Sequence, residues 1–328
     1  MATIQDIADE IGISKAAVSR ILNNKGSFNQ ATIEKVFQTA KRLDYKISGN
    51  FSAFEEQDFK IIAAVFPLVE NPYYSILSSL LEQAAHSYGY SLMICSSLFD
   101  KEKEEECINR LRNKKINGII YGSFTEGISL NEEDHLPIVS IGKKMSSHVP
   151  VVQTDNHAAG LIAGRHLIGK NCRKLLYISG YHAGRQTDER YQGFQEEAKK
   201  SGVDVYPYFT GVDERMNDVP SIITQMLLAH PDADGIFAET LTLAIQCIKV
   251  CHHLGLNIPQ QMKVVGYGNA YLSSYSYPEI SFVRENTKQI AQQAIALLVD
   301  LIENPSSALD DKAMIQIVPV SFEQKQTT

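Results

Sequence analysis

The stretch SKAAVSRILNNKG, residues 14–26, has the spacing of a short helix whose buried side carries Val18 and Ile21. Its first turn is nearly bare of large side chains, which lets a helix backbone approach base edges in a DNA major groove. Lys15 and Arg20 would supply positive charge there, and arginine can donate to O6 and N7 of one guanine together. These residue types favour contact with nucleic acid, although the same spacing also suits a plain surface helix.

A second group of reactive side chains lies in CIKVCHH, residues 247–253. Cys247 and Cys251 share one helix face beside His252 and His253, and soft ligands at such spacing can hold Zn²⁺. No second cluster completes four ligands, and cysteine commonly packs as a small apolar residue. We therefore expect core packing here, with no metal and no cofactor.

The sequence lacks the short motifs of common α/β enzymes. It has no P-loop, no G-x-S-x-G, and no G-x-G-x-x-G after the first strand predicted beyond residue 60. We expect a protein that is not an enzyme. Because doubly wound sheets host many reactions, an α/β enzyme with an appended DNA-binding head stays as an alternative.

Three helical patterns within residues 1–46 would position the cationic surface. The first helix is capped by Thr3 and ends at Gly12, Ser14 caps the second, and Asn29 caps the third. Apolar residues recur at helical spacing inside each pattern. A short turn with glycine between the first two helices is the layout of a helix-turn-helix unit.

Charge is distributed unevenly along the chain of 328 residues. The whole chain carries 31 Lys and Arg against 38 Asp and Glu, a net charge of −7. Residues 1–50 hold seven basic and five acidic residues, or +2, which leaves 24 against 33, or −9, for the remainder. This asymmetry is typical of a nucleic-acid module fused to a soluble domain. Five cysteines, no long apolar run and an acidic N-terminus predict a cytoplasmic protein without membrane contact.

From residue 60 onward, strand-like and helical patterns alternate. Helical stretches include Tyr73–Tyr88 and Arg190–Lys200. The strand-like runs are KIIAAVF, YSLMICS, NGIIYGS, LPIVSIG, PVVQTD, KLLYISG, DGIFAE and KVVGYG. This alternation predicts parallel sheets with helices on both faces. About eight strands exceed a typical single sheet, so we expect two lobes, with ligands bound beyond the carboxyl ends of the strands.

The segments TIQDIADEIGISKAAVSRILNNKG and TIEKVFQTAKRLDYK closely resemble the DNA-binding head of LacI/GalR-family transcriptional repressors. The pieces NPYYSIL, VVQTDNHAAG, ERYQGF, GLNIPQ and VVGYG resemble the effector domain of that family, which looks like the periplasmic sugar-binding proteins. The resemblance implies an N-terminal all-α helix-turn-helix head and a two-lobed α/β effector domain of the periplasmic-binding-protein-like (type I) fold. The expected domains are residues 1–46 for the head, 47–59 for a linker, and 60–328 for effector binding and dimerisation.

The resemblance also implies roles for single residues of the head. Lys15 and Ala16 occupy recognition-helix positions that vary between members and contact bases, and Arg20 matches an arginine that reaches a base. Positions that contact or neighbour phosphate are matched by Thr3, Ser14, Ser19 and Asn23. The family binds as a two-fold dimer, which implies a homodimer on a pseudopalindromic operator in double-stranded DNA.

The linker departs from the family, whose hinge helix commonly carries Ala-Arg-Ser-Leu and wedges leucine into the minor groove. Here residues 51–54 are Phe-Ser-Ala-Phe, and Phe54 would be the apolar wedge. The arginine is absent, and the carboxylates of Glu55 and Glu56 would face phosphates. Two hypotheses stay open: residues 50–57 fold as a hinge helix on DNA, or they form a solvated linker without groove contact.

The effector site departs from the family as well. Arg190 matches an arginine that holds ligand hydroxyls or carboxylate, but a family aspartate is replaced by Gly268. Glu239 and Glu285 also stand where other residues are usual, and either can restore the lost acceptor from a different wall. The expected effector-binding residues are Tyr73, Tyr74, Asp155, Arg190, Glu239, Asn269 and Glu285.

These features predict a sequence-specific repressor of a carbohydrate uptake or utilisation operon. A small sugar or sugar phosphate bound between the lobes would set its affinity for the operator. The altered pocket also leaves open a family regulator that is controlled by a protein partner.

Overall fold

The computed structural model describes residues 3–22, 28–43, 45, 60–112, 116–122, 136–180, 188–210, 218–305 and 314–328. Contacts between Cα atoms divide the chain into two units, residues 1–59 and 60–328. Asn23 and the linker with Phe54, Glu55 and Glu56 lie outside the described residues. Both hypotheses for the linker therefore stay predictions.

The head consists of helices α1 (Ile4–Ile11), α2 (Lys15–Leu22) and α3 (Gln30–Arg42). The expected caps are present, because Thr3 Oγ1 accepts from the Asp6 amide at 3.3 Å and the Asp6 carboxylate accepts from the Thr3 amide at 2.7 Å. Ser14 Oγ accepts from the Ala17 amide at 3.2 Å, and Asn29 Oδ1 accepts from the Thr32 amide at 2.8 Å. The buried core shared by the three helices contains Ile7, Ala8, Val18, Ile21, Val36 and Ala40.

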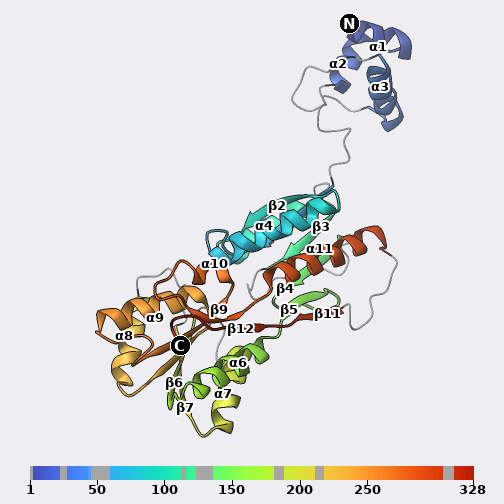
Figure 1. Cartoon of the computed structure of the whole chain (residues 1–328). Coiled ribbons are helices and arrows are strands. Elements are labelled where there is room, and N and C mark those ends of the chain that lie inside the picture. The colour runs from blue at the N-terminus through green and yellow to red at the C-terminus, as the bar shows by residue number, and fades with distance from the viewer. Residues whose placement is uncertain are drawn as a thin grey trace. The chain divides into compact units, whose positions relative to one another are not determined.

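In the body, the described residues form two six-stranded sheets (Figure 1). The first sheet has the order β11 (Ile315–Val318), β5 (Val151–Thr154), β4 (Ile138–Ile141), β3 (Gly118–Tyr121), β1 (Ile61–Phe66), β2 (Ser91–Ser96). The second has the order β12 (Ser321–Glu323), β10 (Ser281–Arg284), β9 (Lys263–Gly268), β8 (Gly235–Ala238), β6 (Lys174–Ser179), β7 (Asp204–Phe209). Neighbouring strands are parallel except β10 and β12. All eight predicted strands are present, in two lobes as expected.

Four further strands, β7, β10, β11 and β12, were not predicted. β10, β11 and β12 are only three or four residues long. β7 is a partly exposed edge strand with Pro207 inside it, and proline at an edge lacks the amide that a central strand would need. The estimate of about eight strands was therefore too low.

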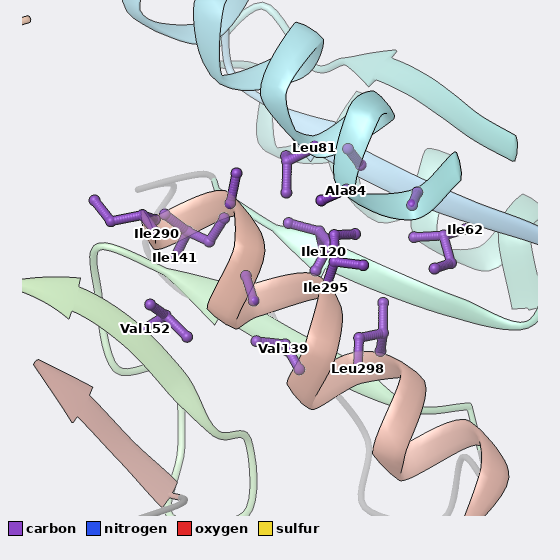
Figure 2. Packing of buried hydrophobic residues seen from close by; sticks show 14 of the residues in the cluster. Ile62, Leu81, Ala84, Ile120, Val139, Ile141, Val152, Ile290, Ile295 and Leu298 are labelled. Atoms are coloured by element: carbon purple, nitrogen blue, oxygen red, sulfur yellow. The ribbon is translucent and has the colours of Figure 1, made fainter. Parts of the chain in front are cut away.

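Helices cover both faces of the first sheet. α4 (Pro72–Ser87) and α11 (Thr287–Glu303) share one core cluster, in which Leu81, Ile295 and Leu298 are fully buried (Figure 2). α5 (Lys101–Arg112) packs on the opposite face through Ile108 and Leu111. Side chains of a strand point alternately to opposite faces, which explains why even-numbered residues of β1 enter the first cluster and odd-numbered ones the second.

The second sheet is covered in the same way. Helices α6 (Asn156–Gly169) and α7 (Glu189–Lys200) pack on one face, and α8 (Val219–Ala229) and α9 (Leu241–His253) on the other. Cys247 and Cys251 are fully buried in the core beneath α9, so the prediction of core packing is confirmed. Within the described ranges, no helix has both the length and the apolar character that spanning a bilayer requires.

The chain crosses between the two sheets three times. β5 of the first sheet leads into α6 on the second, and β10 of the second sheet leads into α11 on the first. The third crossing joins β11 to β12. Thr154 at the end of β5 and Glu285 just after β10 therefore lie where the lobes are connected.

Candidate functional site

Helix α2 presents a small cationic face to solvent. Lys15, Ala16 and Arg20 are exposed and Ser19 is half-buried, while the opposite side of the helix is buried in the core of the head. Residues at such spacing lie on neighbouring parts of one helix face. Among the described residues, the Arg20 side chain is held within its own helix, since its Nε donates to the Ala16 carbonyl at 3.3 Å. Its guanidinium can therefore turn towards a base without breaking a tertiary contact.

Thr3 and Ser14, which are both expected near phosphate, form the N-caps of the first two helices of the head. Thr3 and Ser14 are exposed, and each hydroxyl accepts from an amide in the first turn of its helix. The remaining amides of a helix N-terminus favour an anion such as phosphate. Both residues are thus placed at termini that suit a DNA backbone.

In the body, Arg190 lies at the centre of a buried polar network. It is in the first turn of α7, where its Nε donates to Asn156 Oδ1 at 3.0 Å and its Nη1 donates to the Glu239 carbonyl at 2.8 Å. The guanidinium carbon lies 4.0 Å from the centroid of the Tyr267 ring. A guanidinium over an aromatic face is stabilised by the electron-rich ring, so three elements fix the orientation of Arg190.

Glu239 follows β8 and turns its carboxylate into this network. The side chain is only 3% exposed. One carboxylate oxygen accepts from Ser179 Oγ at 2.5 Å and from the Gly180 amide at 3.0 Å, while the other lies 3.6 Å from Arg190 Nη1. Its carboxylate is therefore held by β6 and α7 together.

Glu285 lies on the other side of Tyr267. Its carboxylate accepts from Thr154 Oγ1 at 2.9 Å, from the Tyr267 hydroxyl at 3.0 Å and from Thr287 Oγ1 at 3.2 Å. Burial raises the pKa of Glu285, and the hydrogen bonds from Thr154 and Tyr267 oppose that rise. Because Thr154 ends a strand of the first sheet, this carboxylate joins the two lobes.

The other expected effector residues have different surroundings. Tyr73 is half-buried near Glu285 and Tyr267. Burial raises the pKa of Tyr73 well above its usual value, and the charges of Glu285 and Tyr267 raise it further. Tyr74 is buried and packs 5.3 Å from Phe66, centroid to centroid. Asp155 is the N-cap of α6, and Asn269 is the N-cap of the short helix α10 (Ala270–Ser273). Of the seven expected effector residues, the structure brings Tyr73, Arg190, Glu239 and Glu285 into one region.

Several members of the network were not predicted. Thr154 and Ser179 end strands, Tyr267 is the last buried residue of β9, and Asn156 starts α6. The available signal was a polar residue at the carboxyl end of an apolar strand, which is where open α/β sheets bind ligands. Asp188 also belongs here, because it caps α7 and accepts from the Tyr177 hydroxyl at 2.6 Å.

A three-helix head with an exposed cationic helix, continuous with two doubly wound sheets, is the architecture of a bacterial DNA-binding regulator with its own ligand domain. The family model described as "Bacterial regulatory proteins, lacI family" matches residues 3–48. The family model described as "Periplasmic binding protein-like domain" matches residues 165–328, which are half of the chain. The chain belongs to the LacI family of bacterial regulatory proteins. The expected family and fold class are confirmed.

Sequence similarity to named relatives extends over nearly the whole chain. The ribose operon repressor of Halalkalibacterium halodurans is 27% identical over 303 residues, which cover 92% of this chain and 91% of the relative. The sucrose operon repressor of Pediococcus pentosaceus is 28% identical over 320 residues, 96% of each chain. A solved structure from Alkaliphilus metalliredigens, a periplasmic binding protein/LacI transcriptional regulator complexed with D-xylulofuranose, has a TM-score of 0.72 and 24% identity. That alignment covers 82% of this chain and 99% of the other, and it shows the fold.

Proposed function

We propose that this regulator represses a carbohydrate uptake or utilisation operon and that a small molecule bound in the body sets its affinity for DNA. The exposed face of α2 supports the DNA role, with Lys15, Ala16 and Arg20 at bases. Phosphate contacts are proposed for Thr3, Ser14, Ser19 and Asn23, with Phe54 as the minor-groove wedge. The names of the ribose and sucrose operon repressors support sugar metabolism as the regulated process.

The polar network around Arg190 is the observation that carries the effector proposal. It lies at the carboxyl ends of strands from both sheets, the place where this class of sheet binds ligands. Arg190 Nη2 has no hydrogen-bond partner among the described residues, so it can donate to an effector oxygen. The effector-binding residues that we propose are Tyr73, Tyr74, Asp155, Arg190, Glu239, Asn269 and Glu285.

A homodimer completes this proposal. Tyr271, Tyr275 and Tyr277 are 59%, 72% and 88% exposed in and just after α10 (Ala270–Ser273), and Met93 and Ile94 are exposed on the edge strand β2. Aromatic side chains and methionine are enriched at protein interfaces. A second copy of the chain that covers these faces would also bring two heads to the half-sites of a pseudopalindromic operator.

The same proposal makes the protein a cytoplasmic regulator and not an enzyme. The polar groups around Arg190 are engaged with one another, and this arrangement suits binding better than bond cleavage. The alternative is a family regulator controlled by a protein partner. It predicts DNA binding that no small molecule changes.

Genomic footprinting with the purified protein would test the DNA role, because genes beside the protected site indicate the transported or metabolised compound. Labelled fragments are then titrated with candidate effectors, and release or tightening is measured. We expect Arg190→Ala to lose the response while operator affinity stays nearly unchanged. The matched control is Arg165→Ala, because Arg165 is exposed on α6 and, among the described residues, forms its ion pair with Glu197. An Arg190→Ala variant that responds at unchanged concentration would remove Arg190 from the site.

A further inference from the structure

Two of the five cysteines of the protein lie together where the edge strand β2 meets helix α5. Cys95 belongs to β2 and Cys107 to α5, and both are half-buried. The Cys107 thiol donates a hydrogen bond to Cys95. Cys172, Cys247 and Cys251 are fully buried. The pair therefore combines two interacting thiols with access from solvent, which the other three cysteines lack.

The register of the first sheet explains why the two thiols meet. β1 and β2 are parallel, and Val65 of β1 is paired with Cys95 of β2. Paired residues point to the same face of a sheet, and Val65 lies in the buried cluster that also contains Ile108 and Leu111 of α5. Both cysteines pack against this cluster. Cys95 therefore points towards α5, and Cys107 lies on α5 beside it.

A short turn joins β2 to α5 and fixes both elements. The Asp100 amide donates to the Ser97 carbonyl at 3.1 Å, and the Asp100 carboxylate accepts from the Lys103 amide at 3.1 Å at the start of α5. The Ser97 amide donates to the Phe66 carbonyl at 2.9 Å, which ties the turn to the end of β1. A disulfide forms without strain only where the backbone already brings two sulfurs together, and this turn keeps the two thiols in such a position.

The contact between the thiols also favours ionisation of one of them. Hydrogen bonding to the Cys107 thiol lowers the pKa of Cys95 to about 7 from 9.0, although burial opposes this change. The same hydrogen bond, followed by burial, raises the pKa of Cys107. Burial raises the pKa of Cys172 to about 11 and that of Cys251 to about 12. Because the thiolate is the nucleophilic form of cysteine, Cys95 is the most reactive of these sulfurs.

Metal binding is a poorer use of this pair than oxidation. Zn²⁺ in a structural site takes four ligands, and the described residues contain no group of three or more side chains that could hold a metal ion. Two adjacent thiols without further ligands match the arrangement of an attacking cysteine beside a resolving one.

We propose that Cys95 and Cys107 are a site of reversible oxidation, at which a hydroperoxide converts the two thiols into a disulfide. Cys95 is the attacking residue and Cys107 is the resolving residue. The site shares no residue with the Arg190 network, and it does not rest on the proposed function.

The reaction has two steps. The Cys95 thiolate attacks the terminal oxygen of the hydroperoxide, the O–O bond breaks, and the proton that Cys95 released neutralises the departing alkoxide or hydroxide. The Cys107 sulfur then attacks the sulfur of the Cys95 sulfenic acid, the S–O bond breaks, and water leaves with the Cys107 proton. Two thiols and one hydroperoxide thus give one disulfide, one alcohol (or water, from hydrogen peroxide) and one water. The two sulfurs lose two electrons together, and the hydroperoxide gains them.

The first test counts thiols in the full-length protein after treatment with hydrogen peroxide at neutral pH. We expect the thiols that react with a maleimide after unfolding to fall from five to three, the mass to fall by two hydrogen atoms, and dithiothreitol to restore all five. Tryptic digestion locates the bond, because Lys101 and Lys103 separate the two cysteines. A disulfide between other cysteines or between two copies, or five thiols remaining when peroxide has oxidised free cysteine in the same sample, would overturn the proposal.

Single variants test the order of attack. Cys107→Ser should leave a sulfenic acid on Cys95 that dimedone labels, whereas Cys95→Ser should be labelled at Cys107 at least tenfold more slowly. Cys172→Ala is the control, and it should form the disulfide as the wild type does, because Cys172 is fully buried. If serine destabilises either variant, alanine at the same position gives the same comparison. Equal labelling of the two single variants would contradict the assigned roles.

Melting temperatures give an independent measurement. The disulfide would close the loop from Cys95 to Cys107 and restrict the unfolded chain, so we expect the oxidised wild type to melt a few degrees above the reduced protein. Peroxide should leave the melting temperature of Cys107→Ala unchanged. An oxidised wild type that melts below the reduced protein would show that the bond distorts β2 or α5, and this would contradict the geometry on which the proposal stands.

Discussion

Gly160 of α6 and Gly193 of α7 bring the two helices into backbone contact. A methyl group on Gly160 would lie 2.0 Å from the carbonyl oxygen of Arg190, and one on Gly193 would lie 2.0 Å from that of His157. Both distances are far below a van der Waals contact. The two glycines thus hold the first turn of α7, with Arg190, against the start of α6, where Asn156 receives its hydrogen bond.

We therefore expect Gly160→Ala to lower the free energy of unfolding by about 3 kcal/mol, the upper part of the usual range for overpacking. The obstructing atoms belong to the backbone, which cannot rotate away as a side chain can. Urea unfolding would measure this loss of stability. Effector titration should also show a weakened response, because the added methyl group must displace the first turn of α7, which carries Arg190.

Gly169→Ala is the matched control on the same helix. Apart from its two chain neighbours and the backbone of its own helix, no atom of the described residues lies within 4 Å of the place where its methyl group would be. Alanine is favoured over glycine inside a helix by about 0.5–1 kcal/mol, so this variant should be as stable as the wild type or slightly more stable. Equal destabilisation by both variants would argue against close packing at Gly160.

Arg20→Ala tests base contact by α2. We expect a loss of about 1–3 kcal/mol on the specific operator and little change on random DNA. Arg42→Ala removes the same charge from an exposed arginine of α3 that pairs with Glu10, and its effect should be small on both DNAs. Equal losses for Arg20→Ala on operator and random DNA would reassign Arg20 to a phosphate contact.

His166 should make stability depend on pH. Burial, and secondarily Lys170, lowers the pKa of His166 to about 4 from 6.5, while its ring stacks on Phe322 and its Nε2 lies 2.8 Å from Thr328 Oγ1. The unfolded chain takes up the proton at a higher pH than the folded protein does. Stability from this residue is therefore complete above about pH 6.5 and is lost as pH falls towards 4.

Between pH 7 and pH 5, linkage gives a loss of up to about 2 kcal/mol from His166. His166→Gln should show a correspondingly smaller loss in the free energy of unfolding over that interval. His252→Gln, at an exposed position, should keep the wild-type dependence. If His166→Gln also keeps it, other groups must cause the dependence.

Local features of the fold could be predicted from the sequence, whereas the partners in the network could not. Thr3, Ser14 and Asn29 were identified as caps because each bonds to an amide three residues along the chain. Glu285, in contrast, accepts from Thr154, which is 131 residues away. Glu239 was predicted as an acceptor for the effector, and the sequence did not indicate that its carboxylate also bonds to Ser179 and Gly180 and lies beside Arg190. Only the packing of β6 beside β8 reveals this arrangement.

The three crossings between the sheets have a consequence for biosynthesis. A nascent chain that leaves the ribosome completes β1 to β5 early, but it must synthesise β6 to β10 before α11 and β11 become available. Until then, the apolar face around Ile62 and Ile120 lacks Ile295 and Leu298 (Figure 2). The first lobe therefore cannot mature before the second has been translated, and chaperones that shield apolar surface have their longest opportunity to bind during that interval.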